Sequence, residues 1–127
     1  MQYYKAVVKV QSDGKSENQE MLVYSDSIYY TEEQVNRFFD GTSLEFETIS
    51  IAKTKITDVI SYEGNRKFKV TLEFVNDSGK EFKTDHIVCA DDITSAKQKT
   101  EEYTAQDTTI SLLSDTKIVE IIGGEDE

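Results

Sequence analysis

The chain has 127 residues, of which 37% are hydrophobic and 31% charged, and its formal net charge at pH 7 is −11. That length suits one domain with a real core, and the hydrophobic content exceeds that of a disordered chain. The negative charge disfavours duplex DNA and anionic membranes as partners and favours basic ones. No run of residues approaches the roughly 20 apolar positions that span a bilayer, and we expect no membrane association. A single cysteine, Cys89, rules out an internal disulfide and indicates a cytoplasmic protein.

Two predicted strands, one in each half of the chain, show apolar residues at every second position. The first run is Tyr4, Ala6, Val8 and Val10, and the second is Phe68, Val70, Leu72 and Phe74. A period of two is typical of a strand with one buried face. Polar turns that contain Asp and Gly follow both runs, at 12–15 and at 76–80. The two halves therefore begin with the same pattern.

A second strand and a helix follow in each half. Residues 22–26 and 87–91 are the matching strands, each with an Ile two positions further on. In the first half, Thr31 and Gln34 have the spacing of a capping box, which predicts that the helix begins there. Its predicted core face is Val35, Phe38 and Phe39, with Gly41 after its end. The second helix has the less apolar face Ile93, Ala96, Thr100 and Tyr103.

A third strand closes each half and completes the repeat. Residues 54–60 and 116–122 both begin with Thr-Lys-Ile, have an acid at the fifth position and end on two β-branched residues. Three similar strands in the same order indicate an internal duplication.

We therefore predict an α+β fold in which a β-β-α-β unit is duplicated, with about six strands and two helices packed in one domain. The single domain covers 1–127, with repeat one at about 2–61, repeat two at about 66–122 and an acidic tail at 123–127. Residues 62–66 read as the turn of a central hairpin that joins the halves around one shared core.

The sequence offers no recognisable catalytic, cofactor or metal site. His86 is the only histidine, so a His-based zinc site cannot form within one chain. His86 and Cys89 point to opposite faces of a strand, which disfavours a Cys–His pair. Phosphate-binding glycine motifs are absent as well. We expect a protein that is not an enzyme and needs no cofactor.

One stretch departs from the acidic average. Residues 53–69 hold five cations against two carboxylates, with a tyrosine among them. Single-strand binders combine aromatic platforms with a basic groove. The candidate binding residues are Lys53, Lys55, Tyr62, Arg66, Lys67 and Lys69. The alternative is an ordinary solvated hairpin, whose lysines prevent edge-to-edge pairing.

Several segments resemble an uncharacterised family, domain of unknown function 4494, found in gut Bacteroidetes and their phages, including crAss-like phages. They are Tyr4-x-x-x-Val8-Lys9-Val10, the helix entry Tyr30-Thr31-Glu32-Glu33 and the strand 54–60. The chain departs from the family pattern in its poorer second helix and its Gly-Gly-acid ending. The resemblance covers essentially the whole chain. It implies a phage or mobile-element context, with no known activity and no functional residues to carry over.

These observations predict a non-enzymatic phage or mobile-element accessory protein that binds single-stranded nucleic acid or a replication protein. One alternative is an acidic DNA mimic that inhibits a host nuclease, polymerase or defence protein, as the charge of −11 suggests. The other is a structural role in a virion or an assembly complex. The partner is thus a protein or single-stranded nucleic acid, and the oligomeric state is left open.

Overall fold

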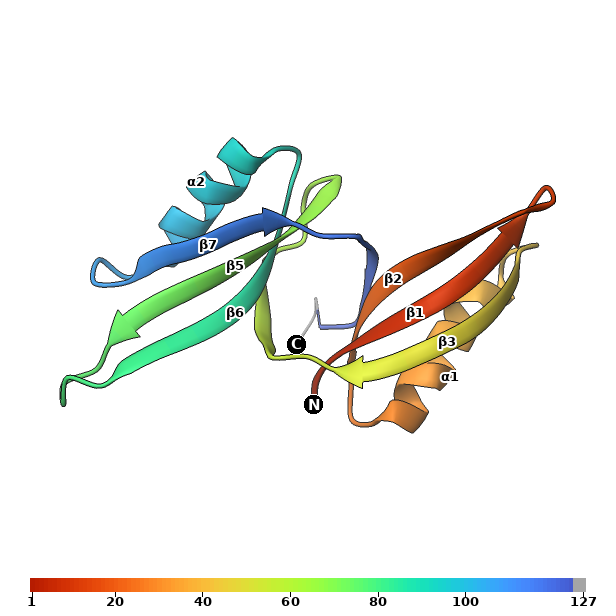
Figure 1. Cartoon of the computed structure of the whole chain (residues 1–127), viewed down its shortest axis with the longest axis horizontal. Coiled ribbons are helices and arrows are strands. Elements are labelled where there is room, and N and C mark those ends of the chain that lie inside the picture. The colour runs from red at the N-terminus through yellow and green to blue at the C-terminus, as the bar shows by residue number, and fades with distance from the viewer. Residues whose placement is uncertain (125–127) are drawn as a thin grey trace. The chain divides into compact units, whose positions relative to one another are not determined.

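The computed structural model describes residues 1–124, which form eight strands and two helices. The elements in chain order are β1 (Gln2–Ser12), β2 (Lys15–Ser25), α1 (Ile28–Asp40), β3 (Glu45–Lys53), β4 (Ile56–Ser61), β5 (Arg66–Val75), β6 (Glu81–Ala90), α2 (Ile93–Tyr103), β7 (Thr109–Asp115) and β8 (Ile118–Ile122). The chain divides into two compact units (Figure 1). Among the described residues, unit 1 is 1–54 together with 117–124, and unit 2 is 55–116.

Unit 1 is a four-stranded sheet with the order β3-β1-β2-β8 and with α1 packed against it. β1 and β2 form a hairpin that pairs along its whole length and turns at Asp13 and Gly14. Both turn residues have positive φ, 52° and 78°, which suits a two-residue hairpin loop. β3 is antiparallel to β1, whereas β8 is parallel to β2.

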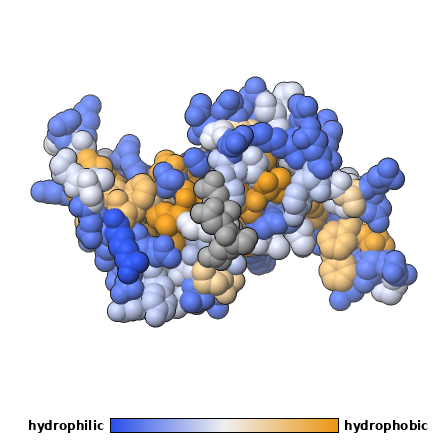
Figure 2. Space-filling view, turned by 180° about the vertical axis from the view of Figure 1, so that it is seen from behind, coloured by the Kyte–Doolittle hydropathy of each residue, from blue (hydrophilic) through white to orange (hydrophobic). Residues whose placement is uncertain are grey.

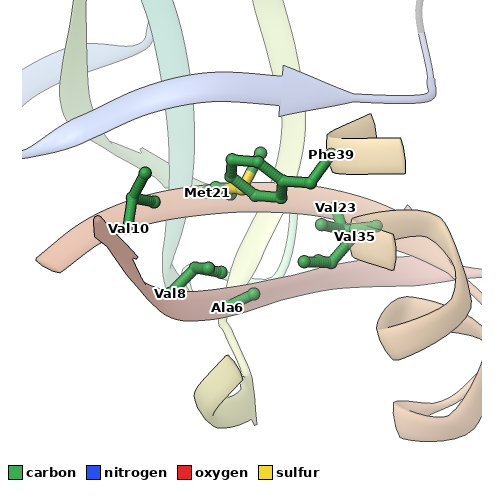
Figure 3. Close-up of a cluster of buried hydrophobic side chains, with 7 residues drawn as sticks. All are labelled: Ala6, Val8, Val10, Met21, Val23, Val35 and Phe39. Atoms are coloured by element: carbon green, nitrogen blue, oxygen red, sulfur yellow. The ribbon is translucent and has the colours of Figure 1, made fainter. Parts of the chain in front are cut away.

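The core of unit 1 lies between the sheet and α1. Its buried residues are Ala6, Val8, Val10, Met21, Val23, Val35 and Phe39, which Figure 3 shows side by side. Phe39 also stacks on Phe46 of β3, with ring centroids 4.7 Å apart. Ile122 of β8 packs against the same cluster. Burial of each large apolar side chain stabilises the unit by about 1.5–3 kcal/mol.

Unit 2 repeats this architecture with the sheet order β4-β6-β5-β7 and with α2 packed against it. Its buried core residues are Phe68, Val70, Leu72, Val88, Ala90 and Ala96. Ile60 of β4 packs against them, as Ile122 does in unit 1. The predicted α+β duplication is therefore confirmed. The alternation of β1 and β5 places three of the four expected residues of each strand in the two cores, whereas Tyr4 is buried outside the cluster and Phe74 is only half-buried.

The last strand of each repeat completes the sheet of the other repeat. β4 follows β3 in the chain but pairs with β6, and β8 follows β7 but pairs with β2. The registers match: Ile56 lies opposite Asp85 as Ile118 lies opposite Glu20. We refer to this arrangement as strand exchange between the repeats.

The short connection between β3 and β4 explains the exchange. Within its own sheet, β4 would have to reach the free edge of β2, three strand spacings from β3, or about 14 Å. Three residue steps, from Lys53 to Ile56, span at most about 11 Å. The step from Asp115 to Ile118 has the same length. Neither strand can therefore reach the far edge of its own repeat.

The two points of departure are built alike. Thr54 donates its backbone N–H and its hydroxyl to the carbonyl oxygen of Tyr3, at 3.1 and 2.8 Å. Thr116 donates the same two groups to the carbonyl oxygen of Lys67, at 3.1 and 2.7 Å. The Thr that opens each matching segment thus fixes the chain to its sheet just before the strand leaves it.

Several sequence predictions are wrong in detail. The described residues form eight strands rather than six, because β3 and β7 were not predicted, and two buried clusters rather than one shared core. Residues 62–65 do not close a hairpin, since β4 pairs with β6 and not with β5. The three acids of the predicted tail, 125–127, lie outside the described residues.

The start of α1 also differs from the prediction. Ser27 is the N-cap, and its side chain accepts a hydrogen bond from the backbone N–H of Tyr30. Thr31 is buried one turn further on, where its hydroxyl donates to the carbonyl oxygen of Ser27 at 2.8 Å. A helix that begins at Ile28 buries Thr31, Val35 and Phe39 at four-residue steps and leaves Phe38 41% exposed.

Candidate functional site

The predicted basic residues do not all belong to one unit. Lys53 ends β3 in unit 1, whereas Lys55, Tyr62, Arg66, Lys67 and Lys69 belong to unit 2. Within unit 2, Lys55 precedes β4, and Tyr62 follows it and is half-buried. Arg66, Lys67 and Lys69 lie on β5. The central hairpin that was expected to present them together does not exist.

Two of these cations are engaged by carboxylates of the same unit. Arg66 pairs with Asp115 at 2.6 Å, and its guanidinium lies 5.0 Å from the ring centroid of Phe68. Lys69 lies 3.7 Å from Asp85. The hydrogen bond from Arg66 holds the pKa of Asp115 below its usual value. In the described part of the chain Lys53, Lys55 and Lys67 form no ion pair within 4 Å.

The Lys69–Asp85 pair has a counterpart in the other repeat. Lys5 on β1 lies 3.5 Å from Glu20 on β2, at the matching positions of unit 1. A pair that occurs at the same place in both sheets is best explained as a cross-strand contact of the scaffold. Lys69 is therefore the weakest of the candidate binding residues.

A polar cluster in unit 2 was not identified from the sequence. Asp58 of β4 is hydrogen-bonded through one carboxylate oxygen to Nδ1 of His86 on β6. Its other oxygen accepts a hydrogen bond of 2.7 Å from the hydroxyl of Tyr103 on α2. The second ring nitrogen of His86 lies 2.7 Å from the hydroxyl oxygen of Thr84. We call these four residues the His86 cluster.

The environment of the cluster shifts two pKa values. The hydrogen bond with His86 lowers the pKa of Asp58 below 3.8, partial burial opposes this, and the Tyr103 hydroxyl adds to the lowering. The hydrogen bond to Asp58, together with desolvation, raises the pKa of Tyr103 to about 12. The cluster therefore favours a charged carboxylate beside a neutral phenol.

The order hydroxyl, imidazole, carboxylate is also the order of a nucleophile, its base and an orienting acid. His86, however, is only 5% exposed, so a substrate has little access to its imidazole. The cluster joins three elements, β4, β6 and α2, around the strand that enters from the first repeat. Its geometry is that of a polar clamp on the exchanged strand.

Unit 1 shows what the fold itself requires at these positions. Met21 lies opposite Glu120 in unit 1, as His86 lies opposite Asp58 in unit 2. By the same alignment Tyr103 corresponds to Phe38. The scaffold thus forms without a histidine here, and the His86 cluster is particular to unit 2. Among residues 1–124, no three His, Cys, Asp or Glu side chains are placed to hold a metal ion.

The aromatic residues near the start of unit 1 differ in exposure. Tyr3 is buried, with its ring 4.7 Å from that of Tyr24. Tyr29 and Tyr30 lie in the first turn of α1 and are 67% and 53% exposed. They are therefore the clearest aromatic platform in unit 1.

The two units together define a class of protein: a duplicated α+β fold whose repeats exchange their last strands. The model of one family, Domain of unknown function (DUF4494), matches residues 2–124, so the chain belongs to this family. No curated protein and no solved structure gave a significant match. In the described residues, neither helix has the length and apolar character needed to cross a membrane.

Proposed function

We propose that this protein is a non-enzymatic accessory protein of a phage or mobile element and that its partner is a polypeptide, such as a replication protein. The observation that carries this choice is the state of the predicted basic residues. Arg66 and Lys69 are paired with Asp115 and Asp85, and Lys53 belongs to unit 1, so among the described residues this stretch leaves unit 2 only Lys55 and Lys67 as cations without an ion pair for phosphates. The net charge of −11 further favours a basic protein over a nucleic acid.

Single-stranded nucleic acid is the second candidate. Lys55 and Lys67 make no ion pair among the described residues, and Tyr62 lies in the same unit. A single-strand platform combines an aromatic ring with cations, and these three residues supply both kinds of side chain. The DNA-mimic and virion alternatives stay predictions, and no contact or distance favours either one.

A lack of enzymatic activity also stays a prediction. It is supported by the burial of the one histidine, since His86 is only 5% exposed and a general base must come within hydrogen-bond reach of the substrate proton that it removes. A purified-protein screen for hydrolysis of activated esters, with His86→Met as the control, would test it. Turnover lost in the variant would contradict the proposal.

A paired binding experiment separates the two candidate partners. Fluorescent single-stranded oligonucleotides are titrated with the protein at low and moderate salt. In parallel, proteins cross-linked to it in cells are identified, purified and measured against it by calorimetry. We expect no oligonucleotide binding and a direct complex with one of the purified proteins. Salt-dependent oligonucleotide binding, weakened by Lys67→Glu, together with no protein complex, would instead establish the nucleic-acid candidate.

A further inference from the structure

Two neighbouring tyrosines are held on the surface at the start of α1. The rings of Tyr29 and Tyr30 meet edge to face, with centroids 5.6 Å apart, and more than half of each side chain is exposed. The space-filling view shows hydrophilic residues over most of the visible surface, with smaller hydrophobic patches between them (Figure 2). An exposed pair of rigid aromatic side chains is typical of binding surfaces, where Tyr is enriched.

The other repeat shows that the fold does not need these tyrosines. α2 starts at Ile93 as α1 starts at Ile28, so Tyr29 and Tyr30 correspond to Thr94 and Ser95. α2 forms and packs against its sheet with these small polar residues. The aromatic pair is thus a property of the first repeat and not a requirement of the scaffold.

The charges beside the tyrosines differ between the repeats in the same way. Glu33 follows Tyr29 by four positions and Tyr30 by three, so it shares their side of the helix, and Glu32 flanks Tyr29. The matching residues of α2 are Lys97 and Gln98. Arg37, one turn beyond Glu33, is the cation nearest in sequence on this side of α1. The aromatic pair therefore has carboxylates as its immediate neighbours.

We propose that Tyr29, Tyr30, Glu32 and Glu33, the α1 face, form the docking surface for an arginine-containing basic segment of the polypeptide partner. This inference rests on the proposed function and specifies its surface. A guanidinium stacks on tyrosine rings and also pairs with carboxylates, so one arginine uses both features of the face. Phosphates would instead meet Glu32 and Glu33, which makes the face unsuitable for nucleic acid.

The test uses the whole chain and a displayed library of random 12-residue peptides. Peptides are selected on the wild-type protein, and their affinities are measured by fluorescence anisotropy. The principal variant is Tyr29→Thr/Tyr30→Ser, which places the α2 residues on α1 and should leave the circular dichroism spectrum and the thermal midpoint unchanged. We expect selected peptides rich in arginine that bind this variant about tenfold or more weakly, as loss of an aromatic hot spot predicts.

Two further variants separate the aromatic and electrostatic contributions. Glu32→Lys/Glu33→Gln also copies α2, and it should remove the preference for arginine and the salt dependence of binding. Thr94→Tyr/Ser95→Tyr puts tyrosines beside Lys97 and Gln98, and it should not create a second site for the selected peptides.

Each remaining outcome contradicts the inference. Peptides that bind the wild type and the tyrosine variant equally would overturn the α1 face while leaving the polypeptide partner of the proposed function intact. Selected peptides without basic residues, or no selected peptides at all, would overturn it too. The cross-linking experiment tests the proposed function independently of these results.

Discussion

Asp58 ties the exchanged strand β4 to two other elements of unit 2 by side-chain hydrogen bonds. Its two carboxylate oxygens are engaged by His86 and Tyr103, which lie on different elements. Glu120, at the matching position of β8, lies opposite Met21 instead. The two exchanged strands are therefore held differently. The hydrogen bonds of a carboxylate help to hold β4, and the corresponding network is missing at the matching position of β8.

The first prediction concerns Asp58 and acid. Because its pKa in the folded protein is lower than in the unfolded chain, its stabilising effect is present above about pH 4 and is lost as the pH falls further. Asp58→Asn should lower the free energy of unfolding at pH 7 by roughly 1 kcal/mol, allowing for solvent screening. Urea unfolding at a series of pH values measures the difference in the free energy of unfolding between the wild type and the variant. This difference should be constant above pH 5 and should shrink below pH 4. A difference that is unchanged at pH 3 would show that the charge of Asp58 is irrelevant.

The second prediction concerns the Tyr103 phenol. Its pKa is raised to about 12, so the neutral form stabilises the fold below about pH 10, and this contribution is lost as the pH rises through 12. Absorbance titration of the tyrosines should show one phenol with a pKa near 12. In Asp58→Asn, where the charged acceptor is gone, this pKa should move back toward 10. Tyr103→Phe is the control, because it removes that component of the titration altogether.

At this scale the sequence predicts the face of a residue better than its partner. Strand parity places His86 and Cys89 on opposite faces, and the β5–β6 register agrees, with His86 opposite Val70 and Cys89 opposite Lys67. The partner Asp58, in contrast, is 28 positions away in the other repeat. No local pattern joins the two residues, because their contact depends on which sheet β4 enters.

At the scale of the element, α1 shows how a shift of its start changes its buried face. The capping-box pattern at Thr31 is real as a sequence pattern, but Ser27 caps the helix first. The extra turn brings Thr31 into the buried row together with Val35 and Phe39. Phe38 then lies outside that row, although i, i+3 and i+4 spacing from Val35 places both phenylalanines in the predicted core.

The third prediction compares these adjacent phenylalanines. Phe39→Ala leaves a cavity between α1 and the sheet and removes the stacking on Phe46, so it should cost about 3–5 kcal/mol. Phe38→Ala removes a side chain that is 41% exposed and should cost about 1 kcal/mol or less. Denaturant unfolding of the two variants measures the difference. Equal losses would show that both rings are core residues, as the spacing alone predicts.

For the whole molecule, the duplication could be predicted from the sequence, but the exchange of strands could not. The two copies of Thr-Lys-Ile at 54–56 and 116–118 identify the repeated strand. Its destination depends on β3 and β7, which occupy the edges beside β1 and β5. Because neither edge strand was predicted, the short connections that lead from β3 to β4 and from β7 to β8 could not be recognised, and their lengths could not be used to predict the exchange. Once β3 is known, the two-residue connection at 54–55 directs β4 to the other sheet.

The exchange leads to a fourth prediction, for a chain that ends at Thr116. This truncation removes β8, the last strand of the second repeat, yet β8 borders β2 in the first repeat. Hydrogen exchange should therefore become faster in β2, at those alternate amides of residues 20–23 whose N–H groups face β8, because their neighbouring strand is gone, while the matching amides of β6 stay protected. If each repeat instead kept its own last strand, the loss of protection would lie in β6.

A chain that ends at Gly124 is the matched control for this truncation. It removes only the three terminal acids and keeps β8, so protection in β2 should equal that of the full chain. In the chain that ends at Thr116, the loss of hydrogen-exchange protection should be limited to the edge of β2. The β1–β2 hairpin pairs over its whole length and keeps most of its core contacts with α1, so unit 1 should loosen at its β2 edge before it unfolds. Global unfolding of unit 1 in the truncated chain would mean that Ile122 contributes more to that core than one partly buried side chain at the sheet edge can explain.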